Sequence, residues 1–203
     1  MAVKAVVFDV GETLVDETRV WSLDADRAGV TRLTLFAALG ALIERRDDHR
    51  NVFQLLGVER GVDHIPYVHE DLYADAVPCI SALRENGYTL ALVGNQPAKT
   101  ESFLRDCGLK VDLVASSDTW GVAKPNPEFF QHVVEWIEVP PEQIAYVGDR
   151  VDNDVLPANE AGMVSVFIRR GPWGLLQSEW PEAEQAAVRI DSLSELPEAL
   201  HGL

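Results

Sequence analysis

Five short apolar runs that alternate with helical stretches constrain the fold of this chain most. The runs are rich in β-branched and aromatic residues and have the length of buried strands: AVVFD, YTLALVG, DLVASS, IAYVGD and VSVFI. Between the later runs lie PAKTESFLRDCG, NPEFFQHVVEWI and NDVLPANEAGM, which have apolar residues at helical spacing. Strands that alternate with helices indicate a parallel sheet covered on both faces. The sequence therefore predicts an α/β fold with a doubly wound parallel sheet.

One long interval, from Glu17 to about Ala76, contains no such apolar run. It contains RLTLFAALGALIERR, with apolar residues at helical spacing, and two shorter segments, NVFQLLG and YVHEDLYADA, that resemble short helices. We therefore expect an α/β core domain formed by residues 1–15 and 77–203. A small helical cap domain, residues 16–76, is expected to be inserted after the first strand.

Charge and composition narrow the range of partners. The chain has 33 acidic and 17 basic residues, a net charge of −16, which repels nucleic acids and anionic membranes. An anionic small substrate would need a local cation, either a metal ion or a positioned Lys or Arg. No run is long enough to span a membrane, and too few residues precede the first strand for a signal sequence. We expect a cytoplasmic protein in which Cys79 and Cys107 are buried free thiols.

The residues that could take part in catalysis or metal binding lie at or after the ends of the predicted strands. These are Asp9, then Gly94 with Asn95, then Lys124 after the third strand, and Asp149 with Asp154. In a doubly wound sheet the carboxyl ends of the strands meet at one crevice. Three carboxylates there would repel each other and take up protons unless a cation is present. Oxygen ligands of this kind suit Mg²⁺, which keeps waters that a phosphate can replace.

Four segments carry a family resemblance. FDVGETL, LVGNQ, GVAKPNPEFF and VGDRVDNDVLPANEAGM resemble, in order, the four motifs of the haloacid dehalogenase-like (HAD) hydrolase superfamily. The resemblance covers nearly the whole chain, and residues 16–76 stand where that superfamily carries its first-type cap. It implies a Rossmann-like core with a helical cap.

The resemblance also implies roles for individual residues. Asp9 would be the nucleophile and a Mg²⁺ ligand, and the backbone carbonyl of Gly11 another ligand. Asp149 would bind Mg²⁺ directly, supported by Asp154, and Lys124 would bridge Asp9 and the phosphoryl group. The expected substrate-binding residues are Gly11, Glu12, Gly94, Asn95 and Lys124. The implied activity is hydrolysis of a small phosphorylated metabolite through an aspartyl phosphate at Asp9.

Two positions depart from the superfamily pattern. Its phosphatases carry a second Asp two residues after the nucleophile, as general acid and base, where this chain has Gly11. They also have Ser or Thr where this chain has Gly94. Glu12 is one candidate to replace the acid, and looser ones are Asp16, Glu17, His49, His64 and His69. Without a replacement, we expect acyl phosphates and phosphates of acidic phenols to react faster than alkyl phosphates.

Three other functions follow from the missing acid. A phosphometabolite-binding protein that has lost turnover remains open. A haloacid dehalogenase is a less favoured alternative, for which Arg19, Arg27 or Arg32 could bind the substrate carboxylate. Phosphonate hydrolysis through a Schiff base requires a lysine in the cap, and the chain has lysines only at positions 4, 99, 110 and 124. That last activity is therefore excluded.

Overall fold

A computed structural model describes residues 2–61, 64–201 and 203. Its centre is a six-stranded sheet in the order β3-β2-β1-β4-β5-β6, in which every neighbouring pair is parallel. The strands are β1 (Ala5–Phe8), β2 (Thr89–Gly94), β3 (Leu113–Ser116), β4 (Ile144–Gly148), β5 (Val164–Ile168) and β6 (Val188–Ile190). The predicted parallel sheet is confirmed, and β6 is an addition to the five expected strands.

The described residues form ten α-helices. They are α1 (Thr18–Ala28), α2 (Arg32–Glu44), α3 (Val52–Leu55), α4 (Ala76–Glu85), α5 (Thr100–Asp106), α6 (Ser117–Trp120), α7 (Pro127–Ile137), α8 (Leu156–Glu160), α9 (Gly171–Gln177) and α10 (Leu196–His201). A π-helical turn, Val151–Val155, precedes α8. The segment YVHEDLYADA, predicted as a helix, contains only a 3₁₀ turn at His69–Asp71 before α4 begins. None of these helices is long and apolar enough to cross a membrane.

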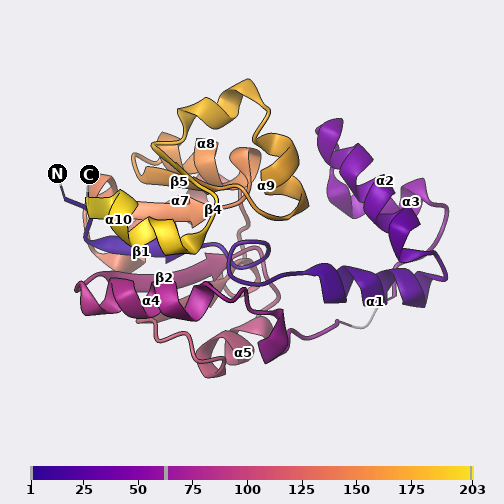
Figure 1. Cartoon of the computed structure of the whole chain (residues 1–203), viewed down its shortest axis with the longest axis horizontal. Helices are drawn as coiled ribbons and strands as arrows, with labels where there is room; N and C mark the ends of the chain where they lie inside the picture. Colours follow the sequence, from indigo (N-terminus) through magenta and orange to yellow (C-terminus); the bar gives the residue numbers. More distant parts are fainter. Residues whose placement is uncertain (1, 62–63, 202) are drawn as a thin grey trace.

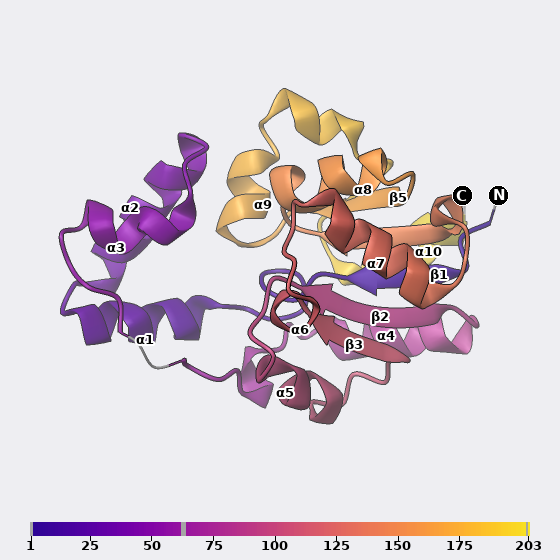
Figure 2. The same ribbon diagram turned by 180° about the vertical axis from the view of Figure 1, so that it is seen from behind.

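Helices cover both faces of the sheet because alternate strand residues point to opposite sides. On one face Val6 and Phe8 of β1 belong to an apolar cluster that includes residues of α4, α5 and α10. On the other face Ala5 and Val7 pack with residues of α7 and α8. Figure 1 shows α4 and α10 in front of the sheet, and Figure 2, from behind, shows α7 in front. Burial on both faces explains why the strands are continuous apolar runs.

Helices α1, α2 and α3 lie beside the sheet, beyond the carboxyl end of β1 (Figures 1 and 2). This helical segment leaves the rest of the chain near Val15 and returns near Leu72, and these two residues pair in an antiparallel bridge. It has an apolar cluster of its own, which Trp173 of α9 joins from the other side. The segment and the sheet therefore meet near the carboxyl ends of the strands.

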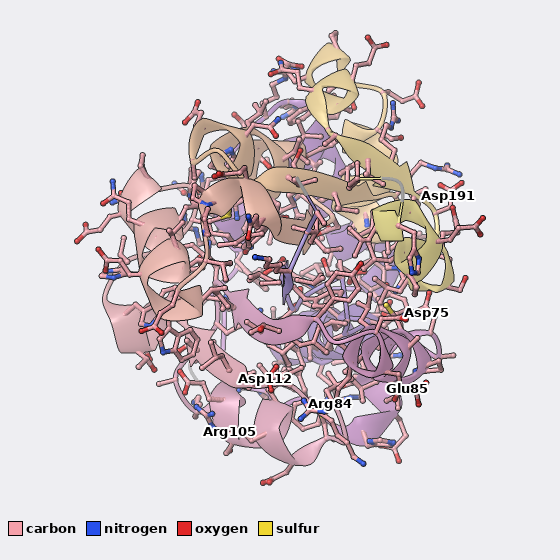
Figure 3. All side chains as sticks on the ribbon, turned by 90° about the vertical axis from the view of Figure 1, so that its left-hand side faces the viewer. Asp75, Arg84, Glu85, Arg105, Asp112 and Asp191 are labelled. Carbon is pink, nitrogen blue, oxygen red and sulfur yellow. The ribbon has the colours of Figure 1, made fainter. Side chains whose placement is uncertain are left out.

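The opposite end of the molecule carries charged surface residues (Figure 3). The guanidinium of Arg84 lies 3.2 Å from the carboxylate of Asp112, and the two side chains are 49% and 40% exposed. Exposed pairs of this kind contribute little to stability, typically below about 1 kcal/mol. The charges that are withdrawn from solvent lie at the other end of the strands.

Candidate active site

Three buried carboxylates meet at the carboxyl ends of β1 and β4. Asp9 directly follows β1 and Asp149 follows β4, and these two strands are hydrogen-bonded neighbours. Asp154 comes from the π-helical turn after β4. One oxygen of each carboxylate lies within 4.8 Å of the others, and all three residues are buried. The crevice expected from the strand ends thus brings together the three predicted acids.

Lys124 supplies a positive charge to this cluster. Its side chain is 1% exposed, and its ammonium lies 2.8 Å from Oδ1 of Asp9 and 2.5 Å from Oδ1 of Asp154. Burial by itself lowers the pKa of Lys124, but the carboxylates of Asp154 and Asp9 outweigh burial and hold that pKa above its ordinary value. Lys124 therefore stays charged, and it neutralises one of the three carboxylates.

Asp149 is the carboxylate that lacks compensation. Its Oδ2 atom is buried and has no hydrogen-bond partner among the described residues. Burial, with Asp154 and Asp9 nearby, raises the pKa of Asp149 well above its ordinary value. A buried acceptor without a partner is costly and suggests a missing positive ligand. The three carboxylates could hold a divalent cation, because oxygen donors fit Mg²⁺.

Two glycines make this close approach of carboxylates possible. A Cβ at Gly94 would lie 2.5 Å from Oδ1 of Asp9, and a Cβ at Gly148 would lie 2.3 Å from the carboxylate of Asp154. Either contact is too short for real atoms. In this structure the carboxylate of Asp9 therefore occupies the space that a side chain at position 94 would need, the position at which the superfamily carries Ser or Thr.

Asn95 and Glu12 lie at the site with their polar groups already engaged. The Asn95 amide receives a hydrogen bond from the Lys124 backbone N–H at 2.8 Å and donates one to the Lys124 carbonyl at 3.0 Å. Glu12 receives hydrogen bonds from Tyr73 Oη at 2.7 Å and from the backbone N–H of Glu17 at 3.0 Å. Burial, with Glu17 close by, raises the pKa of Glu12 to about 7. Asn95 therefore fixes the Lys124 loop, and Glu12 fixes the turn that follows β1.

Gly11 lies next to the carboxylate of Glu17. Its φ is outside the left-handed region, so the backbone at this position would accept a side chain. A Cβ at Gly11, however, would lie only 2.8 Å from Oε1 of Glu17. Desolvation of the Glu17 carboxylate raises its pKa above the ordinary value, against the hydrogen bonds from Tyr67 and Trp21. Of the looser candidates, Glu17 is the one whose carboxylate lies against position 11.

A cleft of about 920 Å³ opens over the carboxylates, between them and the helical segment. Its walls include Asp9, Gly11, Glu12, Glu17, His49, His64, Asn95, Lys99, Lys124 and Asp149. Asp16 and His69, two of the predicted candidates, are outside these walls. The strand ends and the helical segment therefore enclose one space large enough for a small metabolite.

Residues 3–162 match the haloacid dehalogenase-like hydrolase family. This match spans the site and most of the fold. The chain belongs to that family. It is therefore a hydrolase by family, as the motif resemblance indicated.

Individual relatives of this HAD-like hydrolase agree with the assignment. Glyceraldehyde 3-phosphate phosphatase of Methanopyrus kandleri is 30% identical over 203 residues, covering 84% of this chain and 86% of that protein. A HAD phosphatase from Thermococcus onnurineus has a solved structure with a TM-score of 0.64, 25% identity and 98% coverage of both chains. L-2-haloacid dehalogenase from Xanthobacter autotrophicus shares the fold, with a TM-score of 0.71, 20% identity and 99% coverage of both chains.

Two residues of the site escaped the sequence analysis. Tyr146, inside β4, donates a hydrogen bond to the carbonyl of Val93, and its ring lies 5.4 Å from the Lys124 ammonium. Tyr67, from the helical segment, donates a hydrogen bond to Glu17 at 2.5 Å. The sequence around Tyr146 and Tyr67 gives no sign of a function, because the residues that they contact are distant in the sequence.

His49 lies at the edge of the cleft between two tryptophans of the HAD-like hydrolase. Its ring is 5.1 Å from Trp173 and 6.3 Å from Trp21, and its Nδ1 is 3.4 Å from the guanidinium of Arg150. Burial, assisted by Arg150, lowers the pKa of His49 from 6.5 to about 4. The imidazole is therefore neutral in the folded protein at neutral pH.

This neutrality predicts a contribution to acid sensitivity. As the pH falls from 6.5 towards 4, His49 becomes protonated in the unfolded chain but stays neutral in the folded protein. Folding therefore becomes less favourable. At pH 4.5 this contribution is about 2 kcal/mol. We expect His49→Gln to lose less free energy of unfolding between pH 7 and pH 4.5 than the wild type, measured by urea denaturation. His132→Gln, on α7 away from the cleft, is the control for loss of a histidine, and an equal loss in His49→Gln and the wild type would contradict the assignment.

Proposed function

We propose that this protein is a Mg²⁺-dependent phosphohydrolase that acts on a small phosphorylated metabolite through an aspartyl phosphate at Asp9. The observation that carries this proposal is the buried cluster of Asp9, Asp149 and Asp154 with a single ammonium. The family assignment and the phosphatases among its relatives support the same activity. Residues 16–76 are proposed to act as the cap that selects the substrate.

The chain's own residues supply most of the required chemistry. The Asp9 carboxylate attacks phosphorus, the bond from phosphorus to the leaving oxygen breaks, and water then hydrolyses the aspartyl phosphate. Lys124, held between Asp9 and Asp154, neutralises charge on the transferring group. Gly11 has no side chain and lines the cleft, so its backbone N–H is proposed to bind a phosphate oxygen, whereas Gly94 is buried within β2 and does not line the cleft. Mg²⁺, held by Asp9, Asp149, Asp154 and the Gly11 carbonyl, would supply the remaining charge compensation.

The geometry does not favour the haloacid dehalogenase alternative. The guanidinium of Arg19 forms an ion pair with Asp71, and that of Arg32 pairs with Asp26. Neither these two arginines nor Arg27 is among the residues that line the cleft. The buried acids Asp149 and Asp154 are needed for a cation and have no role in dehalogenation.

Replacing Asp149 with asparagine tests the proposed cation site. The wild type should gain about 2.7 kcal/mol of stability at a Mg²⁺ concentration 100 times the dissociation constant, a rise in Tm of roughly 5–10 °C. Asp149→Asn should lose this gain and also lose hydrolysis of p-nitrophenyl phosphate. Without Mg²⁺ the variant should be more stable than the wild type, because burial and the neighbouring carboxylates oppose ionisation of Asp149, and asparagine removes that cost.

The measurements are thermal unfolding with Mg²⁺ or EDTA and phosphate release from p-nitrophenyl phosphate. Asp106→Asn, an exposed acid at the end of α5, serves as the control and should respond to Mg²⁺ like the wild type. An Asp149→Asn protein that still gains stability from Mg²⁺ would show that the cation binds elsewhere. A wild type that releases no phosphate with Mg²⁺ present would refute the phosphohydrolase proposal.

A further inference from the structure

Glu17 occupies the space that a side chain at position 11 would need. A Cβ on Gly11 would lie 2.8 Å from Oε1 and 2.9 Å from Cδ of Glu17. Both separations are shorter than a van der Waals contact, so the Glu17 carboxylate fills the space next to position 11. The carboxylate of Glu17 therefore lies beside position 11, where the sequence itself has only a glycine.

Two buried aromatic residues hold this carboxylate in place. Tyr67 Oη donates a hydrogen bond to Oε1 at 2.5 Å, and the indole Nε1 of Trp21 donates one to Oε2 at 3.2 Å. Within the part of the chain that the structure describes, no Lys or Arg forms an ion pair with Glu17. Glu17 itself is partly exposed and lines the cleft beside Asp9. A fixed, unpaired carboxyl group thus faces the space where a leaving group would depart.

We propose that Glu17 is the general acid and base of the reaction, replacing the aspartate that Gly11 lacks. This assignment rests on the proposed phosphohydrolase function. In the first step the Asp9 carboxylate bonds to phosphorus, the leaving oxygen separates, and that oxygen takes the proton of Glu17. In the second step the Glu17 carboxylate takes a proton from water as the water oxygen attacks phosphorus. Asp9 is regenerated, phosphate is released, and Glu17 is protonated again.

Glu12, the other glutamate near the nucleophile, is less well placed for this role. Its carboxylate accepts hydrogen bonds from Tyr73 and from the backbone N–H of Glu17. A Cβ at Gly171 would lie 2.3 Å from its Oε2, so the backbone after β5 closes off that side. The Glu12 carboxylate is therefore enclosed by the turn and the β5 loop, whereas that of Glu17 lies against Gly11.

The assignment changes the expected leaving-group preference. With Gly11 alone, alkyl phosphates should react poorly because an alkoxide needs a proton. With Glu17 as proton donor, the wild type should hydrolyse an alkyl phosphate efficiently. Glu17→Gln keeps the shape of the side chain and its contacts with Trp21, and it removes the transferable proton. The loss should therefore increase with the basicity of the leaving group.

The experiment compares kcat/KM, with Mg²⁺ present, for p-nitrophenyl phosphate, phenyl phosphate and glycerol 3-phosphate. This parameter reports the steps up to phosphoryl transfer. Glu17→Gln should lower it by roughly 10²–10⁴-fold for glycerol 3-phosphate and by less than about tenfold for p-nitrophenyl phosphate. The variant should also accumulate a covalent phosphoryl group when mixed with acetyl phosphate, detected by intact-protein mass spectrometry, because water activation is lost. Glu44→Gln, an exposed glutamate in α2, should match the wild type in both measurements.

A rescue variant separates this chemistry from a structural effect. Gly11→Asp alone should be impaired, because its side chain would collide with Glu17. Combining Gly11→Asp with Glu17→Ala removes the collision and provides a new acid, so activity on glycerol 3-phosphate should return. Tyr67→Phe, which removes one positioning hydrogen bond, should show a smaller loss with the same dependence on the leaving group.

Three results would overturn the assignment. An equal loss in Glu17→Gln on all three substrates, or no loss, would show that Glu17 transfers no proton to the leaving group. Failure of the double variant to exceed Glu17→Ala on glycerol 3-phosphate would show that a carboxylate at this place is not what the site needs. A wild type that hydrolyses none of these phosphates would refute the proposed function and this assignment with it.

Discussion

Replacing Asp9 with asparagine is expected to lower turnover of p-nitrophenyl phosphate by at least about 10⁴-fold, as removal of a nucleophile does in other hydrolases. An amide cannot attack phosphorus as a carboxylate does, and it is a poorer ligand for a cation. Intact-protein mass spectrometry after addition of acetyl phosphate should detect no phosphoryl group on this variant. Phosphate release at saturating Mg²⁺ gives the rate.

This loss should occur in a protein that remains folded. Asparagine has nearly the shape of aspartate, and Lys124 keeps its contact with Asp154. We therefore expect the circular dichroism spectrum of Asp9→Asn to match that of the wild type. Asp106→Asn, on the surface, is the control for the change of charge. A folded Asp9→Asn protein that still becomes phosphorylated would show that the nucleophile is another residue.

Replacing Lys124 with methionine should produce the largest change in stability. The ammonium is buried between Asp9 and Asp154, and its removal leaves three carboxylates without a fixed positive charge. Breaking a buried ion pair by removing one partner costs about 3–5 kcal/mol, a fall in Tm of about 10 °C for a protein of this size. Thermal unfolding in EDTA measures this fall, and turnover should be lost as well.

Mg²⁺ should restore a larger share of stability to Lys124→Met than to the wild type. The reason is that the cation would then be the main compensation for the carboxylates, whereas in the wild type it shares this role with the ammonium. Lys110→Met removes an exposed lysine and should change neither Tm nor its response to Mg²⁺. An unchanged Tm of Lys124→Met in EDTA would contradict the role assigned to the ion pairs.

The strands and their chemistry could be predicted because both depend on neighbouring residues. A buried strand in a parallel sheet is a continuous apolar run, and the residue after it emerges at a known edge. Asp9 and Asp149 follow this rule, and the segments after β3 and β4 bring Lys124 and Asp154 to the same edge. The strand β6, Val188–Ile190, was missed because three residues with a central arginine do not form such a run.

Helix α9 and the segment YVHEDLYADA could not be predicted, because contacts with residues distant in the sequence determine their conformation. Helix α9 begins with Gly171 and Pro172 and contains Gly174, a composition that favours turns. Its burial of Trp173 against the helical segment stabilises it from outside. Conversely, YVHEDLYADA has helical composition but forms only a short 3₁₀ turn, His69–Asp71, with irregular chain and turns on either side before α4 begins. Part of that chain positions Tyr67 beside Glu17.

Glu17 shows the limit of sequence reasoning about the site. Its side chain is oriented by Trp21, one turn further along the chain, and by Tyr67, fifty residues away. No spacing in the sequence reveals that these three side chains meet over Gly11. The sequence could therefore show that an acid is missing at position 11. Only the structure shows that Glu17 fills that space, held there in part by Tyr67.

The contact between Gly11 and Glu17 also limits the order in which this protein can change over generations. An aspartate introduced at position 11 would collide with the glutamate already present, whereas loss of the glutamate first would leave no carboxylate at that place. Each single step lowers fitness if this carboxylate is required, and only the paired change preserves it. Descendants of this lineage should therefore retain glycine and glutamate together, and sequences with aspartate at position 11 should carry a smaller residue at position 17.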